Sequence, residues 1–333
     1  MAIRLCTYNI ERFDRLFKSN NSLKTGQEAV GRFDALAAVL DAIDADLIGI
    51  VEAPNSTDPG AQSAVAKIEN FASQYGLRTT KAKTGYISAG KQEIAVLYDP
   101  AVLTVSHAPG GSTTSKSNPR FDREYHCDTD DDRIKEVYKH YRPPLEVKVK
   151  VKASGKEFFL IEAHTKSKGI FSSIDMVHLE RESRRNRLKI FAECQWIRRR
   201  IDEWLDKGRH VVVMGDINDG PGMDEYEMRY GRSGVEIIMG SIFEPARILR
   251  NHAGRPKWGS YGWSPSTVRF KDRITETHIN VLIDHILTSV SLKTFGQNPH
   301  QIWNPYENDK AKPLKTELLD ASDHFPVSIN LNL

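Results

Sequence analysis

The sequence predicts a layered α/β fold whose sheets are mixed and contain antiparallel pairs of strands. Short β-rich runs alternate with segments of helical periodicity in the first part of the chain. Two further β-rich runs, at 145–151 and 158–163, then follow each other with no helical segment between them. A purely parallel, doubly wound sheet needs a crossover between successive strands, so this mixture favours layers with antiparallel pairs.

The expected strands are rich in β-branched and aliphatic residues. They span 3–9, 46–52, 94–98, 145–151, 158–163, 211–216, 281–288 and 326–331. In the run 145–151, apolar and charged residues alternate with the period of a half-buried strand. Helices are expected at 30–43, where apolar residues recur at intervals of three and four, and over a longer stretch from about 175 to 206.

Composition limits the class of protein. The chain has 333 residues, of which 39% are hydrophobic, enough for a sizeable core, and its net charge of +3 permits an anionic partner without requiring one. No run approaches the ~20 apolar residues that cross a bilayer, so stable membrane insertion is not expected. The three cysteines form no Cys-x-x-Cys pair, and the N-terminus lacks a signal-peptide pattern. We therefore expect free buried thiols and, by default, a cytoplasmic protein, with secretion after removal of a leader as the alternative.

We expect a single domain over residues 1–333. The stretch 108–141 interrupts the pattern of strands and helices with Gly, Ser, Thr, Lys, Asn and Pro, followed by an acidic run. It is expected to be a mobile surface insertion rather than a linker between domains.

Polar residues with catalytic potential stand where the expected strands end. They are Asn9, Glu52, His164, Asp216, Asn218 and Asp284, with Asp323 and His324 directly before the last strand. Carboxylates bind hard cations such as Mg²⁺. Amides donate to phosphate oxygens without adding charge, and a histidine backed by a carboxylate deprotonates water near neutral pH. These residue types together indicate metal-assisted attack of water on a phosphoester.

Five short segments carry a family resemblance. They are Tyr8-Asn9-Ile10, Ile50-Val51-Glu52, Gly215-Asp216-Ile217-Asn218, Ile283-Asp284-His285 and Ser322-Asp323-His324. In this order, and over almost the whole chain, they resemble the endonuclease/exonuclease/phosphatase superfamily. The resemblance implies a four-layered α/β sandwich, in which two mixed, mostly antiparallel sheets pack face to face with helices outside.

Three further matches resemble the deoxyribonuclease I-like branch of that superfamily. They are Gln92-Glu93-Ile94, the strand end Glu162-Ala163-His164, and Arg142-Pro143-Pro144. The stretch from His164 to Gly169 is also similar to one in bacterial extracellular nucleases. The chain departs from the secreted animal enzymes, which carry structural disulfides, and the insertion has no counterpart that we can place.

The resemblance implies a role for each candidate residue. His324 would be the general base oriented by Asp284, and His164 with Glu93 would form a second histidine–carboxylate pair. Asp216 would lie beside the metal or the attacking water; the sequence leaves open whether it or His324 activates that water. Metal ligands would be Glu52, Asp216 and Asp323, and phosphate contacts would come from Asn9, Asn218 and Arg142. The implied cofactor is Mg²⁺ or Mn²⁺. His285 is left out, because strand alternation points it away from Asp284.

Other polar clusters are weaker candidates. Asp128, Asp130 and Asp132 have the spacing that opens a calcium loop, but Arg133 and Lys139 replace the Gly and Glu of an EF-hand, which leaves only a looser Ca²⁺ site. The arginines between 181 and 200 are interpreted as a solvated helix face. Aromatic and basic residues suited to stacking and phosphate contact also alternate ahead of the Asp284 strand. These are Arg255, Lys257, Trp258, Tyr261, Trp263, Arg269, Lys271 and Arg273.

The favoured function is a divalent-metal-dependent phosphodiesterase, specifically a DNA endonuclease. One alternative keeps the chemistry but acts on phospholipids or phosphoinositides, as sphingomyelinase-like relatives do. The other is an inactive module that binds nucleic acid. The sequence leaves open RNA as the substrate, endo- or exonucleolytic cleavage, the preferred metal and the oligomeric state.

Overall fold

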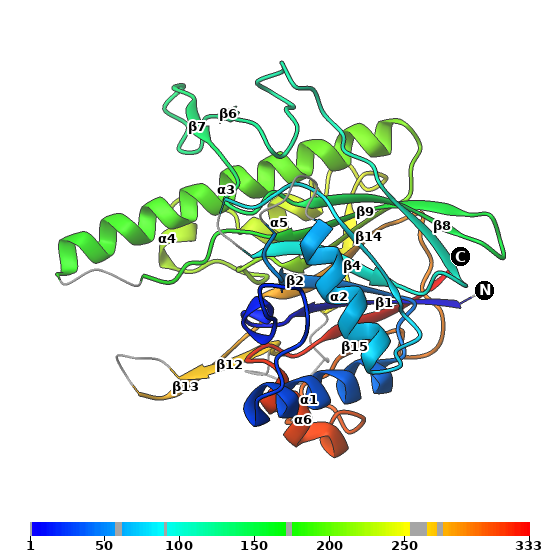
Figure 1. Ribbon diagram of the computed structural model, residues 1–333. Helices are drawn as coiled ribbons and strands as arrows, with labels where there is room; N and C mark the ends of the chain where they lie inside the picture. Colours follow the sequence, from blue (N-terminus) through cyan, green and yellow to red (C-terminus); the bar gives the residue numbers. More distant parts are fainter. Residues whose placement is uncertain (1, 57–61, 90–91, 171–174, 254–264, 272–275) are drawn as a thin grey trace.

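Two mixed six-stranded sheets form the centre of the protein (Figure 1). The computed structural model describes residues 2–56, 62–89, 92–170, 175–253, 265–271 and 276–333. The first sheet has the order β15 (His300–Ile302), β16 (Val327–Asn332), β1 (Ala2–Asn9), β2 (Leu47–Ala53), β4 (Glu93–Tyr98) and β3 (Lys81–Thr84). The second has the order β11 (Leu249–Asn251), β14 (Asp284–Ser289), β10 (Val211–Asp216), β9 (Glu157–His164), β8 (Leu145–Val151) and β5 (Leu103–His107).

Each sheet contains one parallel pair near its middle. Strand β1 runs parallel to β2, and β9 runs parallel to β10. Every other pairing within the two sheets is antiparallel. The four strands of these parallel pairs carry candidate residues at or near their carboxyl ends. These are Asn9 on β1, Glu52 on β2, His164 on β9 and Asp216 on β10.

The sheets pack face to face through apolar side chains. Leu5 and Val96 of the first sheet share a buried cluster with Val147, Leu160 and Met214 of the second. Burial of this kind contributes roughly 25 cal/mol per Å² of apolar surface and is the main force holding the two sheets together.

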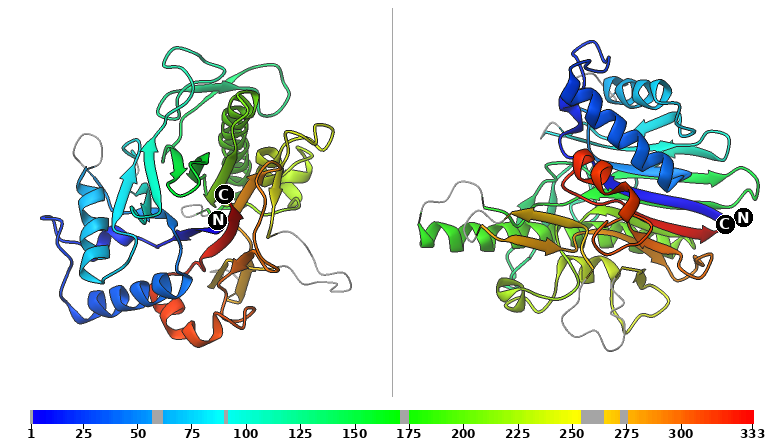
Figure 2. Two further views of the ribbon diagram at one scale, coloured as in Figure 1. Left: turned by 90° about the vertical axis from the view of Figure 1, so that its right-hand side faces the viewer. Right: turned by 90° about the horizontal axis from the view of Figure 1, so that it is seen from below.

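Helices cover both outer faces (Figure 2). The first sheet packs beneath α1 (Gln27–Ile43), α2 (Gln62–Gln74) and α6 (Lys315–Ala321), together with the 3₁₀ turns η1 (Phe13–Leu16) and η3 (Lys312–Leu314). The second packs beneath α3 (Met176–Asp206) and α5 (Gly234–Met239), and α4 (Glu225–Met228) lies against α3. The predicted four-layered α/β sandwich is confirmed.

Strand and helix boundaries agree closely with the sequence pattern. Strands β8 and β10 match their predicted ranges, whereas the run 281–288 divides between two strands. Its first residue ends β13 (His278–Val281), which forms a hairpin with β12 (Val268–Lys271), and the residues from Asp284 onward belong to β14. Helix α3 begins after Asp175, whose carboxylate accepts a hydrogen bond from the His178 N–H at 2.9 Å and caps the helix.

The arginines of α3 correct one prediction. Arg181, Arg184 and Arg185 are exposed, as a solvated face requires, but Arg187 and Arg200 are buried. Arg187 pairs with Asp224 at 2.7 Å, and Arg200 forms a fully buried ion pair with Glu146 of β8. No local pattern indicated these burials, because both partners lie far away along the chain.

The insertion 108–141 is anchored to α3. It contains the hairpin of β6 (Tyr125–Cys127) and β7 (Glu136–Tyr138). Phe121 and Tyr125 are fully buried, and their rings lie 5.5 and 5.2 Å from that of Trp196. The indole N–H of Trp196 donates to the carbonyl of Pro119 at 3.0 Å.

The three cysteines, Cys6, Cys127 and Cys194, are free and buried, as expected. Within the described ranges, no helix is long and apolar enough to cross a membrane. Most of the aromatic and basic segment ahead of β14, including Trp258 and Trp263, lies outside the described residues.

Candidate active site

Three adjacent strands of the second sheet place three candidate residues side by side. In the strand register, Asp216 of β10 lies opposite His164 of β9 on one side and Asp284 of β14 on the other. All three side chains are buried. The Nε2 atom of His164 lies 3.6 Å from Asp216 Oδ2.

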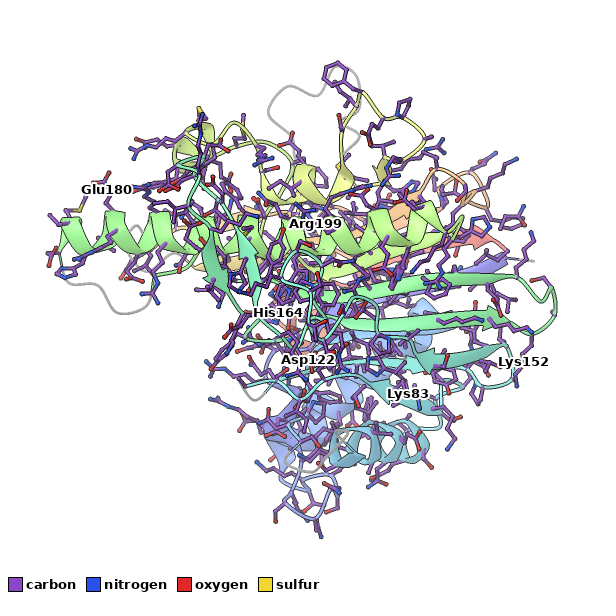
Figure 3. The ribbon with its side chains drawn as sticks, turned by 90° about the horizontal axis from the view of Figure 1, so that it is seen from above. Lys83, Asp122, Lys152, His164, Glu180 and Arg199 are labelled. Carbon is purple, nitrogen blue, oxygen red and sulfur yellow. The ribbon has the colours of Figure 1, made fainter. Side chains whose placement is uncertain are left out.

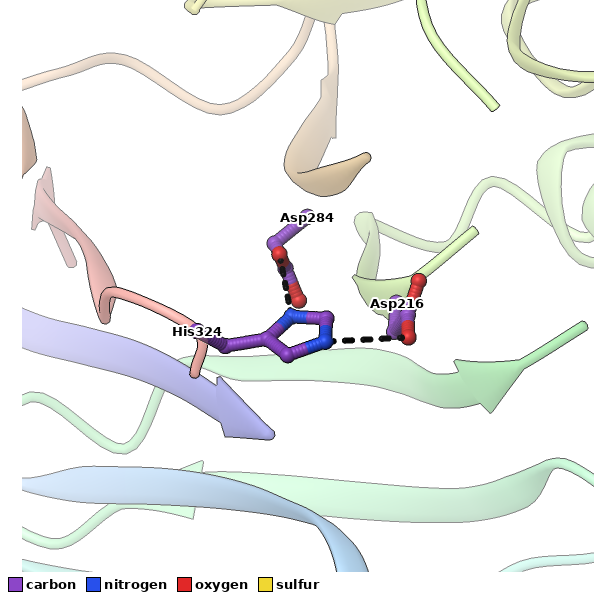
Figure 4. A group of neighbouring side chains, drawn as sticks. All are labelled: Asp216, Asp284 and His324. Carbon is purple, nitrogen blue, oxygen red and sulfur yellow. Dashed lines mark hydrogen bonds and ion pairs between the residues drawn. The ribbon is translucent and has the colours of Figure 1, made fainter. Parts of the chain in front are cut away.

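His324 reaches this row from the first sheet, since it stands just before β16. Its Nδ1 atom lies 2.9 Å from Asp284 Oδ2, and its Nε2 atom lies 3.9 Å from Asp216 Oδ2, so the imidazole sits between the two carboxylates (Figure 4). A carboxylate can only accept, so we assign the Nδ1 proton of His324 to the bond with Asp284. The predicted orientation of His324 by Asp284 is thus present in the structure.

Asn9, at the end of β1, closes the site from the first sheet. Its side-chain amide donates to Asp216 Oδ2 at 3.1 Å and lies 3.3 Å from His324 Nε2. The hydroxyl of Ser322 donates to the Asn9 carbonyl at 2.7 Å and accepts from the backbone N–H of His324 at 3.3 Å. Ser322 therefore holds the segment that carries His324 against the end of β1.

Burial and mutual charge set the protonation of these groups. Burial and the charge of Asp284 raise the pKa of Asp216 to about 7. Burial alone would lower the pKa of His324, but the carboxylates of Asp284 and Asp216 outweigh it and raise that pKa to about 10. Burial, reinforced by Arg142 and His324, keeps the pKa of His164 well below its usual value. The site therefore combines a neutral imidazole with a carboxylate–imidazolium pair.

Two predicted residues have strained backbones at strand ends. Asn218 has a φ of 52°; its N–H donates to Asp216 Oδ1 at 2.9 Å, and its side chain donates to the Thr165 carbonyl at 3.0 Å. Glu52 has a φ of 57° and lies where the pairing of β2 with β4 shifts register. Left-handed conformations and bulges cost free energy and recur where a side chain must be re-aimed at a functional site.

Glu52 belongs to a separate polar group and is not part of the close cluster of Asp216, Asp284 and His324. Its Oε2 accepts from the Arg12 N–H at 2.8 Å and from the Gln92 side chain at 2.5 Å. Gln92 in turn accepts from Arg142. Gln92 was not among the predicted site residues, although it directly precedes Glu93. The signal that could have identified Gln92 is its position directly before a predicted strand.

Two other candidates have different surroundings from those expected. The Glu93 carboxylate accepts from the Ser88 N–H at 3.0 Å. Within the described residues, no hydrogen bond or ion pair joins Glu93 to His164, whose nearest carboxylate contact is Asp216 instead. Asp323 is half exposed at the rim, with its Oδ1 4.0 Å from His324 Nε2. His285 points to the opposite face, as expected, where its Nε2 lies 2.9 Å from the Asp219 carbonyl.

The buried cluster of Asp216, Asp284 and His324 can hold a metal ion. Asp216, Asp284 and His324 offer ligand atoms that all lie within 4.8 Å of one another. Within the described residues, Asn9 Oδ1 and Asp284 Oδ1 are buried oxygens without a hydrogen-bond partner. Such oxygens are costly to bury unless a ligand satisfies them, and carboxylate and amide oxygens suit Mg²⁺. The donor set therefore fits the cation that the sequence implies.

A second acidic group is less well suited to a cation. Asp128, Asp130 and Asp132 also bring ligand atoms within 4.8 Å of one another. However, Asp128 accepts from the Arg133 N–H at 2.7 Å, Asp132 accepts from the Ile134 N–H at 2.7 Å, and Asp130 pairs with Arg184 at 3.1 Å. The three carboxylates thus already accept hydrogen bonds or form an ion pair within the protein, which leaves fewer of their oxygens for a cation.

Sequence reasoning also missed Glu193, a buried residue of α3. Its Oε2 accepts from the backbone N–H of Lys166 at 2.7 Å and so holds the loop that follows His164. The sequence offered no signal for this contact, because Glu193 occurs in an ordinary helical pattern 27 residues further along the chain.

Comparison with known proteins places the chain in a family. A model of the Endonuclease/Exonuclease/phosphatase family matches residues 6–324. No curated protein matches the sequence significantly. Truncated TDP2 of Caenorhabditis elegans is similar in structure, with a TM-score of 0.53 and 14% identity over 100% of this chain and 98% of that one. An endonuclease/exonuclease/phosphatase of Beutenbergia cavernae has a TM-score of 0.51 and 14% identity over 100% of this chain and 72% of that one. At such identities the likeness shows the fold alone. The match of the family model over nearly the whole chain, on a fold that brings these residue types together, means that the protein belongs to the Endonuclease/Exonuclease/phosphatase family.

Proposed function

We propose that this member of the family is a divalent-metal-dependent phosphodiesterase that cleaves DNA internally, as the deoxyribonuclease I-like branch does. The observation that carries the proposal is the imidazole of His324 held between Asp284 and Asp216 at the bottom of a site drawn from both sheets. This arrangement suits proton removal from a water molecule that attacks a phosphodiester.

The Asp216–His324 pair is the proposed proton acceptor. Without a cation, the negative surroundings raise both pKa values, so the pair already holds a proton on the imidazole. A cation bound beside it would lower both pKa values and leave the pair free to take a proton from water. Asp284 fixes the imidazole through Nδ1 and leaves Nε2 facing the site. His164, which is neutral, faces the same Asp216 oxygen as His324 and in this proposal contacts the leaving oxygen or a phosphate oxygen.

Amide and guanidinium donors hold the phosphate in this proposal. Asn9 and Asn218 both donate to Asp216, and Arg142 is near enough to lower the pKa of His164. Asp216 and Asn9 would hold a divalent cation, and Glu52 and Asp323 are the other proposed ligands. When bound there, Mg²⁺ or Mn²⁺ supplies positive charge that stabilises the charge developing on the phosphate and offsets the carboxylates around His324.

The decisive experiment is cleavage of supercoiled plasmid with Mg²⁺ or Mn²⁺, with and without chelator. We expect nicking by the wild type, loss of nicking with chelator, and a rate ~10² to 10⁴ lower for His324→Ala. His210→Ala is the matched control and should cleave normally, because His210 lies between α3 and β10, at the start of β10 rather than at its site end, and contacts Ser291. Intact plasmid with every metal would refute the proposal. Release of headgroups from lipid vesicles alongside intact DNA and RNA would support the phospholipase alternative instead.

A further inference from the structure

A basic groove runs between α3 and the insertion. It is a cavity of about 590 Å³, with one wall formed by Tyr138, Lys139 and neighbouring residues of the β6–β7 hairpin. The other wall is formed by side chains of the N-terminal half of α3. The β6–β7 hairpin lies along this half of the helix in Figure 1. The lining includes five cations, Lys139, Arg181, Arg184, Arg185 and Lys189, and a single carboxylate, Glu124.

The cations of the helix wall are regularly spaced. Arg181, Arg185 and Lys189 stand four residues apart, so each lies about 6 Å from the next along the helix axis and the row is about 12 Å long. A row of three cations can contact successive phosphates of one nucleic-acid strand.

Two of the ion pairs within the groove are exposed and exchangeable, whereas Arg184 pairs with the less exposed Asp130 and Lys189 with the buried Glu193. Lys139 pairs with Glu124 at 3.0 Å, and Arg185 pairs with Glu182 at 3.3 Å while its side chain stays 77% exposed. Among the described residues, Arg181 has no ion pair within 4 Å. Exposed pairs of this kind contribute only about 0–1 kcal/mol, so phosphate oxygens can displace the carboxylates at little cost.

The groove continues toward the candidate active site. A smaller cavity of about 220 Å³ shares Arg185 and Lys189 with it and is also lined by Lys166, two residues after His164. On the insertion side, Tyr141 follows Lys139 by two residues, is half exposed, and has the guanidinium of Arg142 5.5 Å from its ring centre. An exposed ring between two cationic sites is a surface on which a nucleic-acid base can stack.

We propose that this basic groove binds the phosphodiester backbone of the nucleic acid beyond the scissile phosphate. The inference rests on the proposed function for its choice of ligand, and it gives the insertion a role as one wall of the binding surface. It implies a substrate longer than a dinucleotide, gripped on one side of the cleavage point.

The test is binding of labelled single-stranded DNA of 4 and 12 nucleotides, measured by fluorescence anisotropy with chelator at 50–200 mM salt. We expect Arg181→Ser/Arg185→Ser to bind the 12-mer at least ~10-fold more weakly than wild type. The slope of log K against log salt should fall by about 1.4, because two phosphate contacts are lost. The charge-retaining Arg181→Lys/Arg185→Lys should recover most of the affinity.

The matched control removes two exposed lysines at the other end of the molecule. Lys150→Ser/Lys156→Ser changes the β8–β9 turn, beside Lys152, which lies opposite the Glu180 end of α3 (Figure 3). This variant should bind both oligonucleotides within twofold of wild type. Equal affinities of the groove and control variants would overturn the proposal, as would absence of binding by the wild type. Lys139→Ser changes the opposite wall and tests the groove independently if the helix variant proves unstable. It should also weaken binding of the 12-mer.

Hydrolysis of bis(p-nitrophenyl) phosphate by the wild type separates the two proposals. This diester is too small to reach the groove, so its hydrolysis reports only on the phosphodiesterase chemistry. No hydrolysis with any metal would refute the proposed function, while the binding measurements, which need no chemistry, would still decide on the groove.

Discussion

The imidazole of His324 donates through Nδ1 to Asp284 across a distance of 2.9 Å, from one sheet to the other. This bond fixes both the tautomer and the direction of the ring. Asp284→Asn would keep the size of the side chain but remove its charge. We expect kcat for phosphodiester hydrolysis to fall by ~10² to 10⁴, as for loss of an oriented general base.

The same substitution should also change the titration of His324. Removing the charge that most raises its pKa should bring that pKa down from about 10. Ring-proton NMR across pH 5 to 10 would show the change. Asp320→Asn is the control. It makes the same carboxylate-to-amide substitution at an exposed residue of α6 and should leave both kcat and the titration of His324 unaltered. Unchanged kcat in Asp284→Asn would contradict the assigned role.

Glu193 is expected to act on catalysis through the loop after His164. Glu193→Ala removes the acceptor for the Lys166 N–H, so the loop and His164 can shift. Small misplacements of reacting groups are costly, and we expect kcat to fall about 10-fold or more. Glu193→Gln keeps an acceptor oxygen and should recover most of the rate. A purely structural role would instead lower the thermal midpoint of both variants without separating their kcat values.

His140 should make the fold sensitive to acid. It is stacked on Trp196 at 4.5 Å, and burial, with Lys189 and Arg200 nearby, lowers its pKa to about 3. Because its folded pKa is depressed, its contribution is complete above pH 6.5 and declines as the pH falls, when the unfolded chain takes up the proton. The resulting loss in the free energy of unfolding is about 2 kcal/mol between pH 7 and pH 5.

His140→Phe keeps a ring against Trp196 and removes this proton. Its free energy of unfolding should therefore depend less on pH than that of the wild type over the same range. Neighbouring Glu193, whose pKa burial raises to about 7, works in the opposite direction and is present in both proteins. Parallel pH profiles from urea titrations would disprove the assignment.

Gly49 is expected to tolerate no side chain. A Cβ at this position would lie 2.0 Å from the carboxylate of Glu162, which is buried between the sheets and accepts from Thr7 at 2.6 Å. Gly49→Ala should cost about 2–3 kcal/mol through overpacking. Gly31→Ala, on the exposed face of α1 with nothing within 4 Å, should instead stabilise the protein by about 0.5–1 kcal/mol. Urea unfolding of both variants is the measurement, and equal effects would refute the packing argument.

Prediction from the sequence worked best where local pattern and residue type suffice. Alternation revealed β8 and helical periodicity revealed α3. The polar residues that end β1, β9 and β10 converge with Asp284, which begins the antiparallel strand β14. It failed where pairing depends on distant segments. Arg200 is buried because Glu146 meets it beneath α3, 54 residues away, and no local pattern records that meeting. Similarly, the contact of His164 with Asp216 follows from parallel register, which the sequence does not state.

Because the site is divided between the two sheets, catalytic activity should depend on their relative position. Asn9 and His324 belong to one sheet, and Asp216, His164 and Asp284 belong to the other. A slight parting of the layers would pull imidazole and carboxylate out of reach while each layer kept its own hydrogen-bonded ladder. Catalytic activity should therefore be lost at lower urea concentrations than the circular dichroism signal. Neither half of the sandwich alone should be active.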